Sequence, residues 1–146
     1  MAKPSSADFF ILHDVAHFPL VHLNSERMKP GFAEQWCKEQ ERLLDARVPF
    51  VLLLQEGDDD HESIQDRNEV VLWFKKNRQS FRGVCRGIVG IEPDAIKRAL
   101  LYARALVLGP VFGVTTTVAA DGREAGTIAR NLLANGSNEF QHREMD

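Results

Sequence analysis

The sequence predicts a single α/β domain in which a five-stranded, mixed and mostly parallel β-sheet has helices on both faces. Two observations support this prediction. The chain of 146 residues is 44% hydrophobic, which suits one domain with a substantial core. Short apolar runs also alternate with longer segments in which apolar residues recur at helical spacing. Because strand, helix and strand follow one another three times, those strands are expected to pair in parallel through right-handed crossovers.

Five segments have the composition of strands. The first two are separated by a short segment that suits a hairpin loop, so they are expected to pair antiparallel at one edge of the sheet. The third is a continuous apolar run, which is typical of a strand covered on both faces. The strands are expected at 9–13, 19–24, 49–55, 84–91 and 111–118. Residues 9–136 thus form one domain of order ββαβαβαβα, and residues 1–8 and 137–146 are expected to be flexible.

The first two helices are marked by proline and by apolar stripes. Pro30 suits the first turn of a helix, and Pro49 prevents that helix from continuing far beyond Arg47. The second helix is expected over 61–82. The inward-facing residues are expected to be Phe32, Trp36, Leu43 and Ala46 in the first helix, and Ile64, Val71, Phe74 and Phe81 in the second.

The last two helices follow the fourth and fifth strands. The third helix is expected over 92–109 and is stopped by Gly109 and Pro110. The fourth is expected over 121–136, where Asp121 and Glu124 have the spacing of a capping box. The inward stripe of the third helix is expected to contain Ile96, Leu100, Ala103 and Val107.

Composition argues against several classes of function. A net charge of -3 gives no overall attraction to nucleic acid. No apolar run approaches the roughly 20 residues that span a bilayer, and the N-terminus lacks the apolar region of a secretory signal. Cys37 and Cys85 have neither CxxC nor zinc-site spacing. We therefore expect a cytoplasmic protein with reduced cysteines, without nucleic-acid binding or membrane insertion.

The acidic segment after the third strand permits two interpretations. It could hold a cation, because open α/β sheets bind ligands at the carboxyl ends of their strands. It could instead begin the second helix, with Asp59 or Asp60 as the N-cap and Glu62 in a capping box. We favour the helix start, because five adjacent residues cannot all face one ion. Asp58, Asp59, Asp60 and His61 remain the candidate metal ligands.

Other reactive residues do not form a known catalytic pattern. His13, His17 and His22 cluster in the opening hairpin but lack a fourth zinc ligand, so we expect solvated or locally hydrogen-bonded histidines. Cys85 lies within a predicted strand, which favours burial over reactivity. Neither GxSxG nor a kinase signature is present, and no glycine-rich turn opens a helix to bind phosphate. The sequence therefore predicts neither a catalytic residue nor a cofactor.

The order of elements over roughly residues 9–134 resembles that of STAS domains, the anti-sigma-factor-antagonist type of α/β domain. In regulatory STAS domains a phosphorylatable serine stands at the start of the helix after the third strand, and Ser63 falls at about that place. Acidic residues surround Ser63 where that family has a small-residue turn. The resemblance implies a non-catalytic binding or regulatory module without a cofactor.

Residues 70–74, in the second helix, are five consecutive apolar residues. Consecutive helical residues are about 100° apart, so one sheet cannot cover all five. Leu72 and Trp73 are expected to point away from the sheet, and tryptophan is enriched at interface hot spots. We therefore predict that they contact a protein partner or a second copy in a homodimer. The function predicted is a non-enzymatic regulatory module; the alternative is a small metal-dependent enzyme or small-molecule-binding protein using the acidic edge at 58–62.

Overall fold

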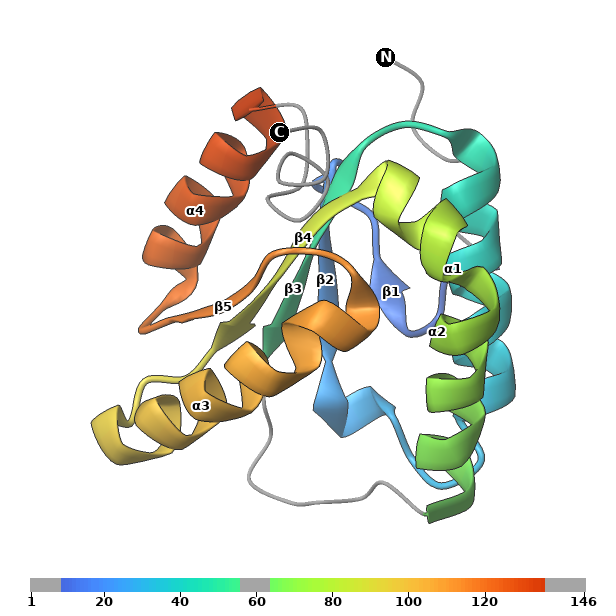
Figure 1. Cartoon of the computed structure of the whole chain (residues 1–146), viewed down its shortest axis with the longest axis horizontal. Coiled ribbons are helices and arrows are strands. Elements are labelled where there is room, and N and C mark those ends of the chain that lie inside the picture. The colour runs from blue at the N-terminus through green and yellow to red at the C-terminus, as the bar shows by residue number, and fades with distance from the viewer. Residues whose placement is uncertain (1–8, 56–63, 136–146) are drawn as a thin grey trace.

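The computed structural model describes residues 9–55 and 64–135 and confirms the α/β class (Figure 1). Within this part of the chain, one sheet contains five strands in the order β1-β2-β3-β4-β5. β1 pairs antiparallel with β2, and the other neighbours pair in parallel, as predicted. The strands are β1 (His13–Asp14), β2 (Leu20–Asn24), β3 (Phe50–Gln55), β4 (Cys85–Ile91) and β5 (Thr116–Ala119).

Four α-helices connect or follow these strands. They are α1 (Ala33–Ala46), α2 (Ile64–Val84), α3 (Ala95–Phe112) and α4 (Gly122–Asn135), and a short 3₁₀ turn, η2 (Ser25–Arg27), follows β2. Because β2 to β5 are neighbours in sequence order, right-handed crossovers place α1, α2 and α3 on one face of the sheet. α4 packs on the opposite face, against β3, β4 and β5 (Figure 1).

The core has two parts, one on each side of the sheet. β3 contributes alternately to both: Phe50 and Leu52 pack with α1 and α2, whereas Val51 and Leu53 pack with α4. These four side chains are completely or almost completely buried. The prediction that this continuous apolar run is covered on both faces is confirmed. A strand with helices on both sides has no face exposed to solvent.

β1 is shorter than the predicted strand 9–13, and the reason is a side chain. The backbone N–H groups of Ile11 and Leu12 donate to the carboxylate of Glu39, on α1. These two N–H groups are therefore hydrogen-bonded to a helix side chain and do not pair with a neighbouring strand. Regular pairing begins only at His13.

Some helix ends follow local sequence signals and others do not, since α1 begins at Ala33 rather than at Pro30. α1 ends at Ala46, and Arg47 takes the left-handed conformation with φ 55°. At α4, the Asp121 carboxylate accepts from Glu124 N at 2.8 Å, and the Glu124 carboxylate accepts from Ala120 N at 2.8 Å. The prediction that α3 stops at Gly109 and Pro110 is wrong, because that helix continues to Phe112 and ends at Gly113, whose φ is 79°.

The predicted inward stripe of α3 is also wrong. Ile96, Leu100 and Val107 are 75%, 64% and 70% exposed, and Ala103 is exposed as well. The fully buried residues of α3 are small, namely Ala105 and Gly109. Leu101 lies directly above Gly90, where an added Cβ would be 2.9 Å from its Cδ2, and Phe112 packs against the core. α3 therefore faces the sheet with a different stripe from the predicted one and leaves six large apolar residues outside.

The inward stripes of the other two helices are closer to the prediction. In α1, Phe32, Trp36 and Leu43 are buried as expected, and Ala46 is half-buried. In α2, Phe74 and Phe81 are buried, but Ile64 and Val71 are exposed. α2 lies against α1 as well as against the sheet. The buried side of α2 therefore faces α1 as well as the sheet, and Ile64 and Val71 lie on the exposed side of α2.

Candidate functional site

The acidic segment predicted as a possible cation site lies outside the described residues. In the sequence it follows Gln55, the last residue of β3. Both interpretations of this segment, and the correspondence with a phosphorylated serine, therefore stay predictions. The residues concerned are Asp58, Asp59, Asp60, His61, Glu62 and Ser63.

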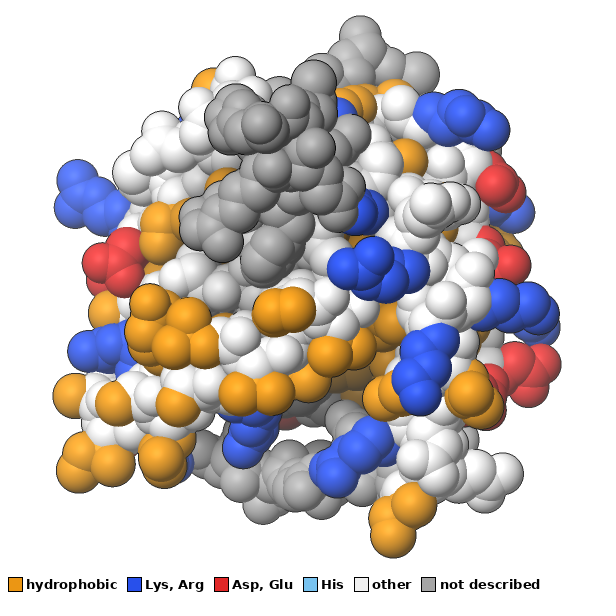
Figure 2. Space-filling view, viewed as in Figure 1, with side chains coloured by type: hydrophobic (Ala, Val, Ile, Leu, Met, Phe, Trp, Pro, Cys, Tyr) orange, Lys and Arg blue, Asp and Glu red, His pale blue; other side chains and the backbone are white. Residues whose placement is uncertain are grey.

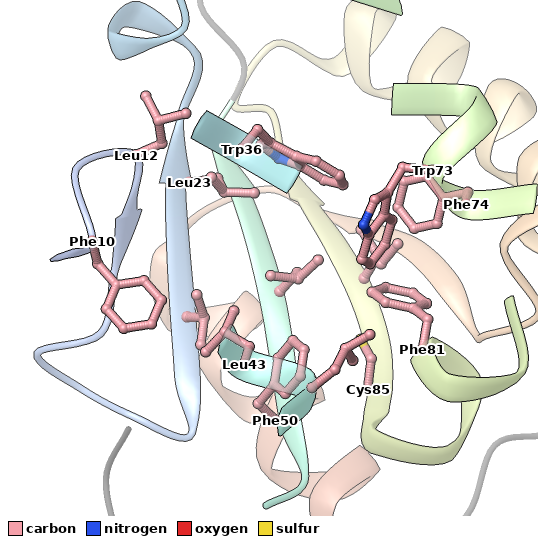
Figure 3. Close-up of a cluster of buried hydrophobic side chains, with 14 of the residues drawn as sticks. Phe10, Leu12, Leu23, Trp36, Leu43, Phe50, Trp73, Phe74, Phe81 and Cys85 are labelled. Carbon is pink, nitrogen blue, oxygen red and sulfur yellow. The ribbon is translucent and has the colours of Figure 1, made fainter. Parts of the chain in front are cut away.

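Trp73 does not lie on the surface but points toward the neighbouring helix α1. The side chain is 7% exposed, and its ring lies 5.5 Å from Trp36 on α1 and 6.2 Å from Phe81, measured between ring centroids. Figure 3 shows these rings gathered together above β3 and β4. An indole enclosed by its own chain is not available to a partner. Leu72 is 63% exposed, so a contact through Leu72 stays a prediction.

The opening histidines are separated by the fold rather than gathered into one site. His13 is buried on the α1 side of the sheet, where Nδ1 lies 2.8 Å from Glu39 Oε1 and Nε2 lies 3.0 Å from Gln40 Nε2. The rings of His17 and His22 lie on the other side, with centroids 6.1 Å apart. Among the described residues, no group of three or more His, Cys, Asp or Glu side chains could hold a metal ion.

The His13 and Glu39 pair has the composition of a catalytic dyad but the environment of a structural element. Glu39 accepts hydrogen bonds from the backbone N–H groups of three consecutive residues, 11 to 13, and from Gln35 Nε2 at 2.7 Å. Burial raises the pKa of Glu39, but the hydrogen bonds from the His13 ring, from Gln35 and from the backbone outweigh it and lower this pKa to about 2. Burial lowers the pKa of His13, so its neutral form donates Nδ1–H to the carboxylate and accepts at Nε2 from Gln40.

The thiols are equally unsuited to nucleophilic chemistry. Cys85 is fully buried in β4, and this burial raises the pKa of its thiol to about 12. Cys37 on α1 has a pKa raised to about 11, by burial first and by Glu69 and Glu41 second. Since a thiolate is the reactive form of cysteine, neither thiol is reactive at neutral pH. Cys85 is buried as expected, whereas Cys37 is only half-buried.

A hollow of about 310 Å³ lies beside the opening hairpin, on the face of the sheet that carries α4. Asp14 pairs across the strands with His22, and His22 with Leu53, whose side chain packs with α4. Burial lowers the pKa of His22, and Asp14 partly opposes this effect. The hollow combines polar groups of both signs, which suits a small polar molecule. It is lined by Leu12, Asp14, His17, His22, Leu23, Arg27 and Gln55.

The most unusual surface belongs to α3, and the sequence prediction missed it. Six large apolar side chains of this helix are exposed, although a surface helix normally turns such residues inward. Figure 2 shows them as a row of hydrophobic side chains across the front of the molecule. We call these residues the outer face of α3. They are Ile96, Leu100, Tyr102, Leu106, Val107 and Val111.

A signal for this surface was present in the sequence. The 18 residues of α3 contain only three charged side chains, Lys97, Arg98 and Arg104. Such a helix is apolar on nearly all sides, and a helix of that kind is normally buried on all sides. One sheet can cover only one side of it. The excess of apolar residues therefore indicates a second covering surface.

The fold and this surface define a small α/β domain with an exposed apolar helix. No family model, curated protein or solved structure matches the chain. Within 9–55 and 64–135, no helix has both the length and the apolar character needed to cross a membrane.

Proposed function

We propose that the chain is a non-enzymatic binding module that acts through protein contacts, and that the outer face of α3 is its contact surface. The observation that carries this proposal is the exposure of six large apolar side chains on one helix, each 43–75% exposed. They lie on one helix, and a contiguous exposed apolar patch larger than a few hundred Å² on a monomer normally marks an interaction site. A stable interface buries roughly 800 Å² on each partner.

The interior supports the same proposal. The buried carboxylate, imidazole and thiols described above are held in protonation states that suit structure rather than catalysis. The element order shared with STAS domains, which implies a binding or regulatory module, adds further support. A cytoplasmic setting remains part of the proposal.

Co-purification tests this proposal. The full chain would be expressed with an affinity tag in its native cell, beside a Leu100→Asp/Val107→Asp variant and an Ile64→Asp control. Each of the three residues is exposed, so folding should survive and circular dichroism would verify it. We expect a protein that is retained by the native chain and the control, is lost with the double variant, and binds again when both proteins are pure. Retention that is unchanged in the double variant would contradict the proposal.

A second candidate function, binding of a small polar molecule, is favoured by the hollow beside the hairpin. It offers His22 on β2, Arg27 after β2 and Gln55 at the end of β3. Ligand-observed NMR with a library of small polar molecules would test this function. Binding that His22→Ala and Arg27→Ala both abolish supports it, and binding that survives both substitutions contradicts it.

A further inference from the structure

Both the pattern of the outer face of α3 and the charges beside it restrict what can bind there. At about 100° per residue, the outer face separates into two ridges of large side chains. Ile96, Leu100, Val107 and Val111 form one ridge, and Tyr102 and Leu106 form the other. Between them stand small or compact exposed residues, Ala99, Ala103 and Pro110. A shallow groove between two ridges is the shape into which a ridge of another helix packs.

The charges on α3 and on the neighbouring half of α2 have one sign, although Glu92 and Asp94 precede α3 at its N-terminal end. Arg104 lies next to the first ridge. Arg78 of α2 reaches the C-terminal end of α3, donating to Pro110 O at 3.0 Å and to Val111 O at 3.3 Å. The second half of α2, residues 75–84, contains four Lys and Arg residues and α3 contains three, and neither stretch contains Asp or Glu. Figure 2 shows Lys and Arg side chains beside the apolar row, with Asp and Glu toward the margins of the view.

We infer that the outer face of α3 binds an acidic amphipathic helix of a partner protein. The apolar side of that helix would fill the groove at Ala99 and Ala103, and its carboxylates would face Arg104, Arg78 and Lys75. This mode of recognition is common for amphipathic segments. With a length of about 27 Å at 1.5 Å per residue, α3 can accommodate several turns of a partner. The inference rests on the proposed function and specifies the chemistry of the partner.

The same charges argue against two other occupants. Pairing two copies through α3 supplies no carboxylate from α3 or from residues 75–84, and the two carboxylates just before the helix, Glu92 and Asp94, accept hydrogen bonds from its N-terminal backbone. Most of the cations would then face apolar residues or one another. An anionic membrane would attract these cations. However, the outer face of α3 contains neither Trp nor Phe, the aromatic residues that interfacial helices typically insert, and its centre is formed by alanines and proline. A grooved face fits a helix better than it fits a bilayer surface.

Fluorescence anisotropy with designed peptides tests the inference. The probe is an 18-residue helical peptide with leucines along one side and glutamates along the other, and its matched control carries lysines in place of the glutamates. We expect the full chain to bind the acidic peptide at least about tenfold more tightly, which corresponds to about 1.4 kcal/mol. The difference should shrink as salt is added, because exposed charges are screened. Equal binding of both peptides, or binding of neither, would overturn the inference.

Substitutions on each side of the contact sharpen the test. Leu100→Asp/Val107→Asp should weaken binding of the acidic peptide at least about tenfold, whereas Ile64→Asp, at the exposed start of α2, should leave it unchanged. Lys75→Glu/Arg104→Glu should reverse the preference toward the lysine peptide. If the reversed charges leave the preference unchanged, the inference is wrong.

The other occupants are distinguished by two further measurements on the same variants. A dimer found by light scattering, or binding to phosphatidylglycerol vesicles, would overturn the inference if Leu100→Asp/Val107→Asp abolished it. A co-purified partner that contacts α3 through a segment without acidic residues would overturn the inference and leave the proposed function standing. If the chain showed neither a preference for the acidic peptide nor a partner whose binding depends on α3, both the inference and the proposed function would be wrong.

Discussion

The carboxylate of Glu39 and the imidazole of His13 lie 2.8 Å apart with both side chains completely enclosed. Glu39 comes from the middle of α1, and His13 opens the edge strand of the sheet. The same carboxylate also accepts from the backbone N–H groups of residues 11 to 13. One side chain therefore attaches the opening segment to the first helix.

Glu39→Gln is predicted to destabilise the fold. The amide nitrogen of glutamine would face backbone N–H groups, and these groups would lose the carboxylate oxygen that accepts from them. Each buried donor without an acceptor costs about 1–3 kcal/mol. We expect the free energy of unfolding to fall by roughly 2–4 kcal/mol, measured by urea denaturation. Glu34→Gln is the matched control on the same helix, because Glu34 forms only an exposed pair with Lys38. Equal effects of the two substitutions would refute the role assigned to Glu39.

The stability of the chain should decrease in acid. The pKa of Glu39 is about 2 in the folded chain and about 4.3 when unfolded. Between these values the unfolded chain binds more protons, so the contribution of Glu39 is complete above about pH 5 and is lost toward pH 2. The pKa of His13 is also lowered. Below about pH 6.5 the imidazole of the unfolded chain therefore binds a proton, whereas the buried imidazole of the folded chain stays neutral to a lower pH.

Both groups therefore lower the free energy of unfolding as the pH falls. The effect of His13 begins first, and the effect of Glu39 follows at lower pH. Denaturation between pH 7 and pH 3 should show a steadily falling free energy of unfolding. Glu39→Gln should flatten the acidic part of this profile. A variant profile as steep as that of the native chain below pH 5 would show that another carboxyl is responsible.

Asp66→Ala is predicted to destabilise α1, although Asp66 belongs to α2. The N-cap residue of α1 is Phe32, whose side chain cannot accept a hydrogen bond. Asp66 takes over this role, accepting from Gly31 N at 2.8 Å and from Ala33 N at 3.1 Å. Loss of an N-cap costs about 0.5–2 kcal/mol, measurable by thermal or urea unfolding. Asp45→Ala, at an exposed position near the other end of α1, should change stability by less than about 0.5 kcal/mol.

Trp73→Ala is predicted to cost about 3–5 kcal/mol, the usual cost of truncating a buried aromatic residue. Trp73 packs with Trp36, Phe74 and Phe81, so its removal leaves a cavity between α1, α2 and the sheet. Leu72→Ala, one position away and exposed, should be nearly neutral. The prediction fails if urea unfolding shows the two variants to be equally stable.

The sequence was sufficient to predict the class of fold and the direction of pairing. Alternating apolar runs and stripes determine which segments are strands and which are helices, and β3 shows this clearly. It was not sufficient to orient helices that are apolar on several sides. α3 offered two apolar stripes, and only the space above Gly90 decides which of them faces the sheet.

The polar interior was also beyond sequence reasoning. Glu39 and Asp66 stand in helices where a solvated carboxylate is the ordinary expectation, and their partners are backbone groups 26 to 35 residues away. Nothing local to either residue indicates those contacts. The outer face of α3, in contrast, could have been noticed, because a helix of 18 residues with three charges has more apolar surface than one sheet can cover.

Site-specific photo-crosslinking tests most directly the claim that the outer face of α3 is a protein contact surface. The crosslinking amino acid benzoylphenylalanine would replace Ala103, in the middle of the outer face, and in a second variant Glu41, exposed on α1. Both full-length variants would be irradiated in the native cell. We predict a discrete crosslinked product with another protein from position 103 and none from position 41. Absence of a product at position 103, with the protein folded and abundant, would contradict the claim.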